Sequence, residues 1–400
     1  MDSARTVVSP RARAASPSGR DTPATMPATP RPLRTLLAAG GLVLGLAAAC
    51  SDPPASAATA TKPPPRSAEP PPPPATATPP AKTRQLPTLI GGASSASPLV
   101  VTHAGVGTPL IEADGAQKAA DAGIAALLAG APALDTAVIA TAHLENDPRY
   151  NAGTGANIRL DGKTIQMDAA LMSDDGKFAA VAAIERVKNP IRVAHLVLGS
   201  PHVLLVGEGA TRFAHKLGIP DETPTSPQAE ANYKTRMARL KQVLQARGSK
   251  EPDWRDYWNF PGDMPADMAA WKHGGDTVGA VVRTHDDHFA ASLSTGGTSV
   301  TLYGRVGDVP IYGAGLFAGP AGAVACTGHG EEIVRQSLAR TVYTAMAGGA
   351  PARDAVEHAA ANFHATWDVG LIAVDRSGWA AAATQEMATG HAPPSAPPAP

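Results

Sequence analysis

Cysteine is nearly absent from this chain of 400 residues, which has only Cys50 and Cys326. Cys50 follows a signal-like segment and is expected to carry a lipid, which leaves Cys326 without a partner. We therefore expect no disulfide, even in an exported protein. Cysteine and histidine also form no cluster with metal-ligand spacing, and we interpret His285–His288 as the tip of a hairpin.

A surplus of charge is absent as well. The chain has 34 Lys and Arg residues against 35 Asp and Glu residues, for a formal net charge of −1. This balance gives no electrostatic reason to expect nucleic acid or an acidic membrane surface as a partner. The apolar run at residues 36–49 is shorter than the roughly 20 residues that span a bilayer.

That run predicts export rather than a membrane span. Arg31 and Arg34 precede it, as in the basic region of a signal peptide. It ends in Leu46-Ala47-Ala48-Ala49-Cys50, which resembles a bacterial lipoprotein signal with Cys50 as the acylated first residue. We expect a periplasmic or outer-membrane-anchored lipoprotein, with ordinary export and nearby cleavage as the alternative. Met26 is a plausible true start within the signal at residues 1–50.

Proline and alanine mark off the ends of the chain. Residues 51–98 are rich in Pro, Ala and Thr and cannot build a core, so they predict a disordered tether. Residues 386–400 predict a disordered tail. Between these ends we expect helices at 113–129, 133–143, 191–198, 331–346 and 352–363, and strands at 99–102, 178–186, 203–206, 277–282, 288–294 and 370–375.

The most informative residue is Thr277, which opens an apolar run in mid-chain. Gly-Gly-Asp precedes it and Val-Gly-Ala-Val-Val follows, a pattern typical of the start of a buried strand. If the chain cut itself between Asp276 and Thr277, the new α-amine could serve as base for the threonine's own hydroxyl. The alternative is a buried threonine in an uncut strand.

Further motifs surround Thr277 in a fixed order. They are Leu144–Gly153, Met167–Ala169, Lys188–Ile191, Pro201–Ala210, Ser294–Gly297, Gly304–Asp308 and Cys326–Glu331. Each is weak alone, but the set in this order resembles the plant-type asparaginase / isoaspartyl aminopeptidase family from about residue 100 to residue 375. Glycosylasparaginases and taspase-type proteases are relatives of that family.

The resemblance implies an α+β fold, the four-layer αββα sandwich of N-terminal-nucleophile hydrolases; periodicity alone predicts only mixed helices and strands. Residues 99–276 would form the α-subunit, ending in a variable linker at 223–272 that its tryptophans anchor to the body, and residues 277–385 the β-subunit. Family members are usually dimers of αβ units, so a dimer is expected.

The resemblance also assigns the chemistry. Thr277 would attack the carbonyl of Asp276 to cleave the chain, and its freed amine, with a pKa near 8, would then act as base. Thr295 matches a threonine that hydrogen-bonds near the nucleophile. The Thr327 hydroxyl and the Gly328 amide match the donors to the oxyanion. Asn151 matches the family asparagine that supports the nucleophile.

Arg305 and Asp308 match the residues that hold the substrate. Arginine binds a carboxylate bidentately and aspartate pairs with an ammonium group, so together they suit the two α-groups of an aspartyl substrate. The predicted substrates are L-asparagine and β-aspartyl dipeptides, with L-aspartate released. A surface ion pair is the alternative for these two residues taken alone.

A structural sodium is implied by resemblance only, and no catalytic cofactor is expected. The family holds this ion on backbone carbonyls, and the matching positions are Leu144, Glu145, Asp147, Tyr150, Ala152 and Thr154.

Two departures from the family keep alternatives open. The glycine loop near the site reads His103-Ala104-Gly105, which adds a methyl group, and residues 365–370 replace a second glycine-rich loop at the pocket rim. Asp276 is the residue that glycosylasparaginases carry, which makes a sugar-asparagine hydrolase the runner-up. The altered loops motivate a third hypothesis, a non-catalytic anchored binding protein. The asparaginase-like motifs around Asn151 and Thr295 favour the first hypothesis, as does the lack of a tryptophan near His103.

Overall fold

The computed structural model describes residues 88–93, 98–245, 277–298 and 301–393. The predictions for the signal segment, Met26, Cys50 and most of the tether lie outside the described residues. So do Asp276 and the part of the predicted linker from residue 246 onward. The lipid anchor and the cut at Asp276–Thr277 therefore stay predictions.

Two antiparallel-rich sheets form the centre of the described part. A seven-stranded sheet has the order β12-β2-β6-β7-β3-β4-β5, and a five-stranded sheet has the order β1-β11-β10-β9-β8. The strands of the first are β2 Leu99–Val106, β3 Met167–Ser173, β4 Phe178–Ile184, β5 Leu204–Val206, β6 Val278–Arg283, β7 Phe289–Thr295 and β12 Met387–Ala392. Those of the second are β1 Thr88–Ala93, β8 Leu316–Gly319, β9 Gly322–Gly328, β10 Val369–Val374 and β11 Gly378–Ala383.

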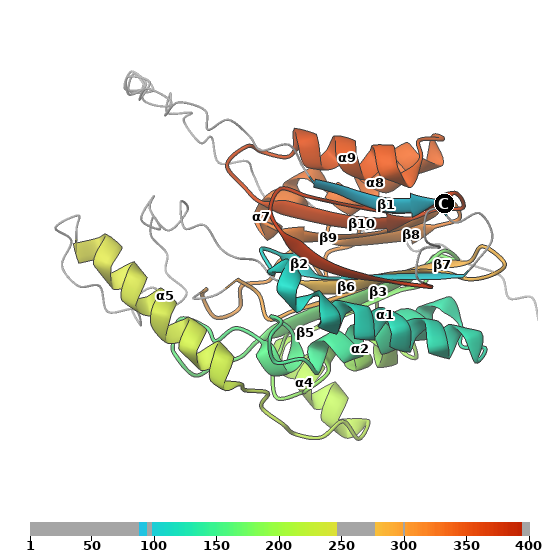
Figure 1. Cartoon of the computed structure of the whole chain (residues 1–400). Coiled ribbons are helices and arrows are strands. Elements are labelled where there is room, and N and C mark those ends of the chain that lie inside the picture. Colours follow the sequence, from blue (N-terminus) through green and yellow to red (C-terminus); the bar gives the residue numbers. More distant parts are fainter. Residues whose placement is uncertain (1–87, 94–97, 246–276, 299–300, 394–400) are drawn as a thin grey trace, which may run out of the picture. The chain divides into compact units, whose positions relative to one another are not determined.

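Helices cover the outer face of each sheet (Figure 1). Helices α1 Ala113–Leu128, α2 Ala133–Glu145, α3 Pro190–Val197 and α4 Gly207–Lys216 pack on the larger sheet. Helices α7 Gly330–Gln336, α8 Leu338–Ala347 and α9 Ala352–Asn362 pack on the smaller one. No helix in the described part of the chain is long and apolar enough to cross a membrane.

The inner faces of the two sheets pack against each other. In β6, Ala280 and Val282 join the core under the helices, whereas Val281 joins the core between the sheets. Successive side chains of a strand point to opposite faces, so a strand covered on both faces is apolar throughout. The result is the four-layer αββα sandwich that the family resemblance implied.

Most predicted elements are present, with shifted ends. The hairpin around residues 285–288 is confirmed, because β6 and β7 pair with Arg283 opposite Phe289. The single helix predicted at 331–346 is wrong, since Ser337 adopts a left-handed φ of 44° and separates α7 from α8. Sequence analysis also missed β3, β8, β9 and β11.

The ends of the body extend further than predicted. Strand β12 lies in the predicted tail and pairs with β2, where Met387 and Ala392 reach 4% and 1% exposure and so belong to the core. Strand β1 lies in the predicted tether and pairs with β11. Helix α5 Pro227–Gln245 lies in the predicted linker, and its start is capped by Ser226 Oγ, which accepts from the Ala229 amide at 3.0 Å.

Candidate active site

Thr277 lies at the point where the two sheets meet. The pairing of Val278 with Ser294 places Thr277 opposite Thr295, at the end of the central strands. The Thr277 nitrogen donates to Thr327 Oγ1 of the other sheet at 3.4 Å, and Val106 N donates to the same oxygen at 3.4 Å. Thr277 is buried, with 5% of its surface exposed. The first of these contacts joins two predicted site residues, Thr277 beside the larger sheet and Thr327 in the smaller one.

Asn151 fixes the turn that follows β7. The side-chain Nδ2 of Asn151 donates to the Gly297 carbonyl at 2.6 Å. The main-chain carbonyl of Asn151 accepts from the Gly296 amide at 2.9 Å. Gly297 N in turn donates to Thr295 Oγ1 at 3.0 Å. A side chain at Gly296 would collide with Asn151 Oδ1, which explains the glycine. Asn151 thus positions Thr295, across the strand pair from Thr277.

A pocket brings the predicted nucleophile and the predicted substrate anchors together. Its lining residues are Thr277, Thr295, Gly297, Thr298, Arg305, Asp308 and Gly328. Five of them are site residues predicted from the sequence. Gly330, the first residue of α7, leaves room for the anchors, since a Cβ there would lie 2.7 Å from Asp308 Oδ1 and 2.9 Å from Arg305 Nη2.

Asp308 is buried with an unsatisfied oxygen. Its Oδ2 atom has no hydrogen-bond partner among the described residues, and only 4% of the residue is exposed. Burial raises the pKa of Asp308 to about 7, although the nearby Arg305 guanidinium opposes the shift. An unpaired, buried carboxyl group is suited to a cationic group that arrives with a ligand.

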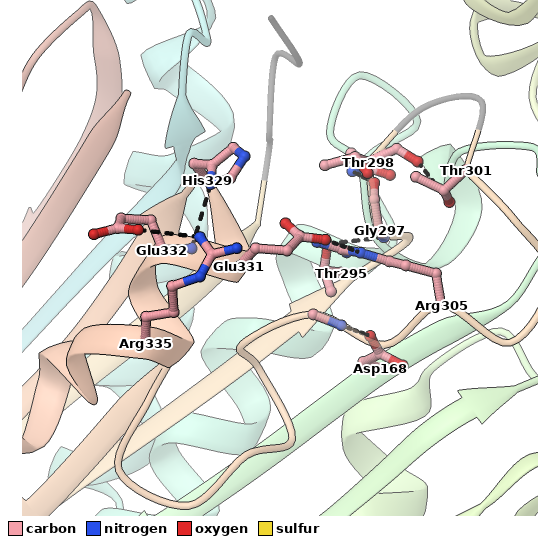
Figure 2. Close-up of polar contacts among 12 residues, drawn as sticks. Asp168, Thr295, Gly297, Thr298, Thr301, Arg305, His329, Glu331, Glu332 and Arg335 are labelled. Atoms are coloured by element: carbon pink, nitrogen blue, oxygen red, sulfur yellow. Dashed lines mark hydrogen bonds and ion pairs between the residues drawn. The ribbon is translucent and has the colours of Figure 1, made fainter. Parts of the chain in front are cut away.

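Arg305 is paired with Glu331, at the start of α7 (Figure 2). Its Nε donates to Glu331 Oε1 and its Nη2 to Oε2, each at 3.0 Å. The positive charge of Arg305 lowers the pKa of Glu331 to about 2, against the opposing effect of its partial burial, so Glu331 is anionic at neutral pH.

Buried polar side chains hold the loop that carries Arg305 and Asp308. Asp168 Oδ2 accepts from the Gly307 amide at 3.2 Å, a contact drawn in Figure 2. Arg159 Nη2 donates to the Arg305 carbonyl at 3.1 Å, and Gln166 Oε1 accepts from the Gly304 amide at 2.7 Å. Burial lowers the pKa of Arg159 to about 10, but this value is still high enough for the guanidinium to be charged at neutral pH. Sequence reasoning placed Asp168 in a family motif without a stated role and did not single out Arg159 or Gln166, because no short motif signals a lone buried arginine or glutamine.

The two departures from the family pattern have different consequences. Ala104 is fully buried in a cluster with Tyr150, Ala152 and Val278, so its methyl group packs in the core and does not line the pocket. In the second loop, Trp367 stacks on the His329 ring with centroids 3.8 Å apart. The Asp368 carbonyl accepts from His329 N at 2.9 Å. This loop therefore lies against the segment after Gly328, as expected for part of the pocket rim.

The segment predicted to hold sodium, residues 144–154, is tightly folded around backbone carbonyls. Gly155 lies against the carbonyls of Pro148 and Tyr150, and Gly153 lies against that of Glu145. The Thr154 hydroxyl is buried and has no hydrogen-bond partner among the described residues. Oxygen atoms of this kind suit a hard cation. The Glu145 carboxylate itself accepts from Ile191 N at 2.9 Å and so caps α3.

The fold and the pocket define a class. A four-layer αββα sandwich with a threonine at the start of a central strand is the architecture of the N-terminal-nucleophile hydrolases. The chain belongs to the asparaginase family, whose model matches residues 96–393.

Curated relatives agree with this assignment. The plant-type L-asparaginase of Pyrococcus furiosus is 36% identical over 290 residues, which cover 70% of this chain and 90% of that protein. The isoaspartyl peptidase/L-asparaginase of Danio rerio is 36% identical over 300 residues, covering 71% and 88%. Its namesake from Homo sapiens is 35% identical over 255 residues, covering 61% and 75%.

Proposed function

We propose that this chain is a self-cleaving threonine amidohydrolase that releases L-aspartate from L-asparagine and β-aspartyl dipeptides. The observation that carries the proposal is the pocket in which Arg305 and Asp308 lie beside Thr277. An anchor for a carboxylate and an anchor for an ammonium group, both near a nucleophile, select a substrate with two free α-groups. Only its side-chain amide or isopeptide bond then reaches the nucleophile.

The chemistry would run in two stages. First, Thr277 Oγ1 attacks the carbonyl of Asp276, the peptide nitrogen becomes the leaving group, and water opens the resulting ester. In the mature enzyme the free amine of Thr277 takes the hydroxyl proton, and Oγ1 attacks the side-chain carbonyl of the substrate. The Thr327 hydroxyl and the Gly328 amide would stabilise the oxyanion. Ammonia or an amino acid leaves with a proton, and water hydrolyses the aspartyl ester.

A comparison of three substrates tests the proposal. We expect purified protein to release L-aspartate from L-asparagine and from β-aspartyl-leucine, and to leave N4-(β-N-acetylglucosaminyl)-L-asparagine uncut. Asp276 is the sequence feature that favours the sugar-linked substrate, so preferential cleavage of that compound would replace the proposal with a glycosylasparaginase. Binding of L-aspartate without turnover of any of the three would establish a binding protein instead.

We also propose that the segment at residues 144–154 holds a sodium ion. The unpaired Thr154 hydroxyl and the close approach of the Tyr150 and Glu145 carbonyls to Gly155 and Gly153 support this. Replacing sodium in the buffer with N-methylglucamine at equal ionic strength should lower the melting temperature by about 2 °C, corresponding to roughly 1 kcal/mol for a body of this size. An unchanged melting temperature in the same buffers would refute the sodium site.

The dimer of αβ units stays a prediction.

A further inference from the structure

The Arg305–Glu331 pair has a feature that the proposed chemistry does not use. A guanidinium group can bind a carboxylate through its side-on edge, Nε with Nη2, or through its end-on edge, Nη1 with Nη2. Glu331 takes the side-on edge, with both contacts at 3.0 Å. Within the described residues Nη1 donates no hydrogen bond, and it lies near Gly307, where a Cβ would approach it to 2.8 Å.

This arrangement fixes the orientation of the guanidinium plane. An arginine side chain has several rotatable bonds, and a bidentate contact removes much of that freedom before a ligand arrives. Arg305 lines the pocket together with Thr277 and Asp308, and its side chain is 15% exposed. Because one edge is already occupied, a ligand carboxylate can meet only the end-on edge.

The surroundings explain why Glu331 keeps its charge. Glu331 is half exposed, with 47% of its side chain accessible, and Arg305 is the cation that faces it most closely. Gly330 lets the start of α7 approach Arg305 and Asp308, since any Cβ at that position would crowd both. Asp168 and Arg159 contact only the main chain of the loop that carries Arg305. Glu331 is the carboxylate that forms hydrogen bonds with the Arg305 side chain.

We propose that Glu331 is a positioning residue, which holds the Arg305 guanidinium so that its end-on edge binds the α-carboxylate of the substrate. The inference rests on the proposed function for the identity of the substrate. It makes Glu331 act through Arg305 and not by touching the ligand. Removal of the Glu331 carboxylate should therefore weaken the binding only of substrates that have an α-carboxylate.

The test pairs a protein change with a substrate change. In Glu331→Gln, KM for L-asparagine should rise about 10-fold while kcat stays within about twofold, because the lost contact orients a binding group. For 3-aminopropanamide, which is asparagine without its α-carboxylate, the same variant should change kcat/KM by less than about twofold. Non-additivity of this kind identifies two groups that act together.

The neighbouring glutamate supplies a matched control. Glu332 pairs with Arg335 at 3.1 Å, on the same helix but away from Arg305 (Figure 2). Glu332 also accepts from Gln336 Nε2 at 2.8 Å. Glu332→Gln should leave both substrates unaffected. Glu331→Asp, which keeps the charge on a shorter side chain, should give an intermediate KM and serves in place of Glu331→Gln if that variant is insoluble. Intact mass shows whether each variant is cut like the wild type.

Three results would overturn the inference. They are equal losses of kcat/KM for both substrates, the same loss in Glu332→Gln, or a lower KM in Glu331→Gln, which would make Glu331 a competitor of the substrate.

If wild-type protein turns over neither substrate, the proposed function fails, and the dissociation constant of L-aspartate then tests the role of Glu331. A roughly tenfold weaker binding in the variant then supports the positioning role. No binding of L-aspartate to the wild type, or no change in the variant, refutes it.

Discussion

Thr277→Ala is expected to remain a single uncut chain and to lose at least about 10⁴-fold in kcat, the scale seen when an enzyme loses its nucleophile. The physical reason is that one hydroxyl serves both reactions. It attacks the preceding carbonyl during maturation, and it attacks the substrate afterwards. Denaturing intact-mass measurement should show two fragments for the wild type, the smaller beginning at Thr277, and one chain for the variant.

Two other variants separate a chemical effect from a loss of folding. Thr277→Ser keeps the hydroxyl and should still be cut, more slowly, because it loses the methyl group that fixes χ1 of threonine. Thr284→Ala changes a threonine at the other end of the same hairpin, where the hydroxyl contacts Asp286 on the surface, and should be processed normally. Cleavage of Thr277→Ala at the wild-type position would rule out the proposed nucleophile.

How far the sequence predicted the site depends on how locally each part is encoded. Thr277 was found because a glycine-rich turn followed by an apolar strand is a local pattern, and the register that sets it opposite Thr295 follows from the hairpin. Arg305 and Asp308 share one short loop, so their proximity was also predictable. Their convergence on Thr277 from another part of the chain rested on family resemblance, because residue spacing says nothing about how two sheets pack.

The parts that escaped prediction are long-range contacts. Strand β12 looked like a tail, since a short segment with glycine and histidine shows its role only when it pairs with β2. Glu331 ends the motif Cys326–Glu331, but the sequence did not indicate that its carboxylate accepts a hydrogen bond from Arg305. Buried polar residues such as Asp168 are satisfied by main-chain amides distant in sequence, here those of Ala183 and Gly307. The motif Met167–Ala169 marked Asp168, but it could not show which distant amides the carboxylate accepts from.

Asp308→Asn should lower kcat/KM for L-asparagine by about 10²- to 10³-fold, because it leaves the α-ammonium group of the substrate in a buried site without its counter-charge. Asparagine has nearly the shape of aspartate, so packing changes little. Isothermal titration with L-aspartate should show the same loss in the dissociation constant. An affinity within about threefold of the wild type would remove Asp308 from the binding site.

The pH dependence of L-aspartate binding gives a second, independent readout of the same carboxyl group. Burial raises the pKa of Asp308 to about 7, so the protonated form dominates below that pH and the anionic form above it. Only the anion attracts an ammonium group, and affinity should therefore increase about tenfold from pH 6 to pH 8.

Glu331, with its pKa lowered to about 2, stays ionised throughout this window, and burial keeps the pKa of His329 below its usual value. Burial also raises the pKa of Asp168, but Asp308→Asn retains that group. A flat pH profile in the variant would thus assign the titration to Asp308, whereas an unchanged slope would assign it to Asp168 or another group and contradict the proposed role.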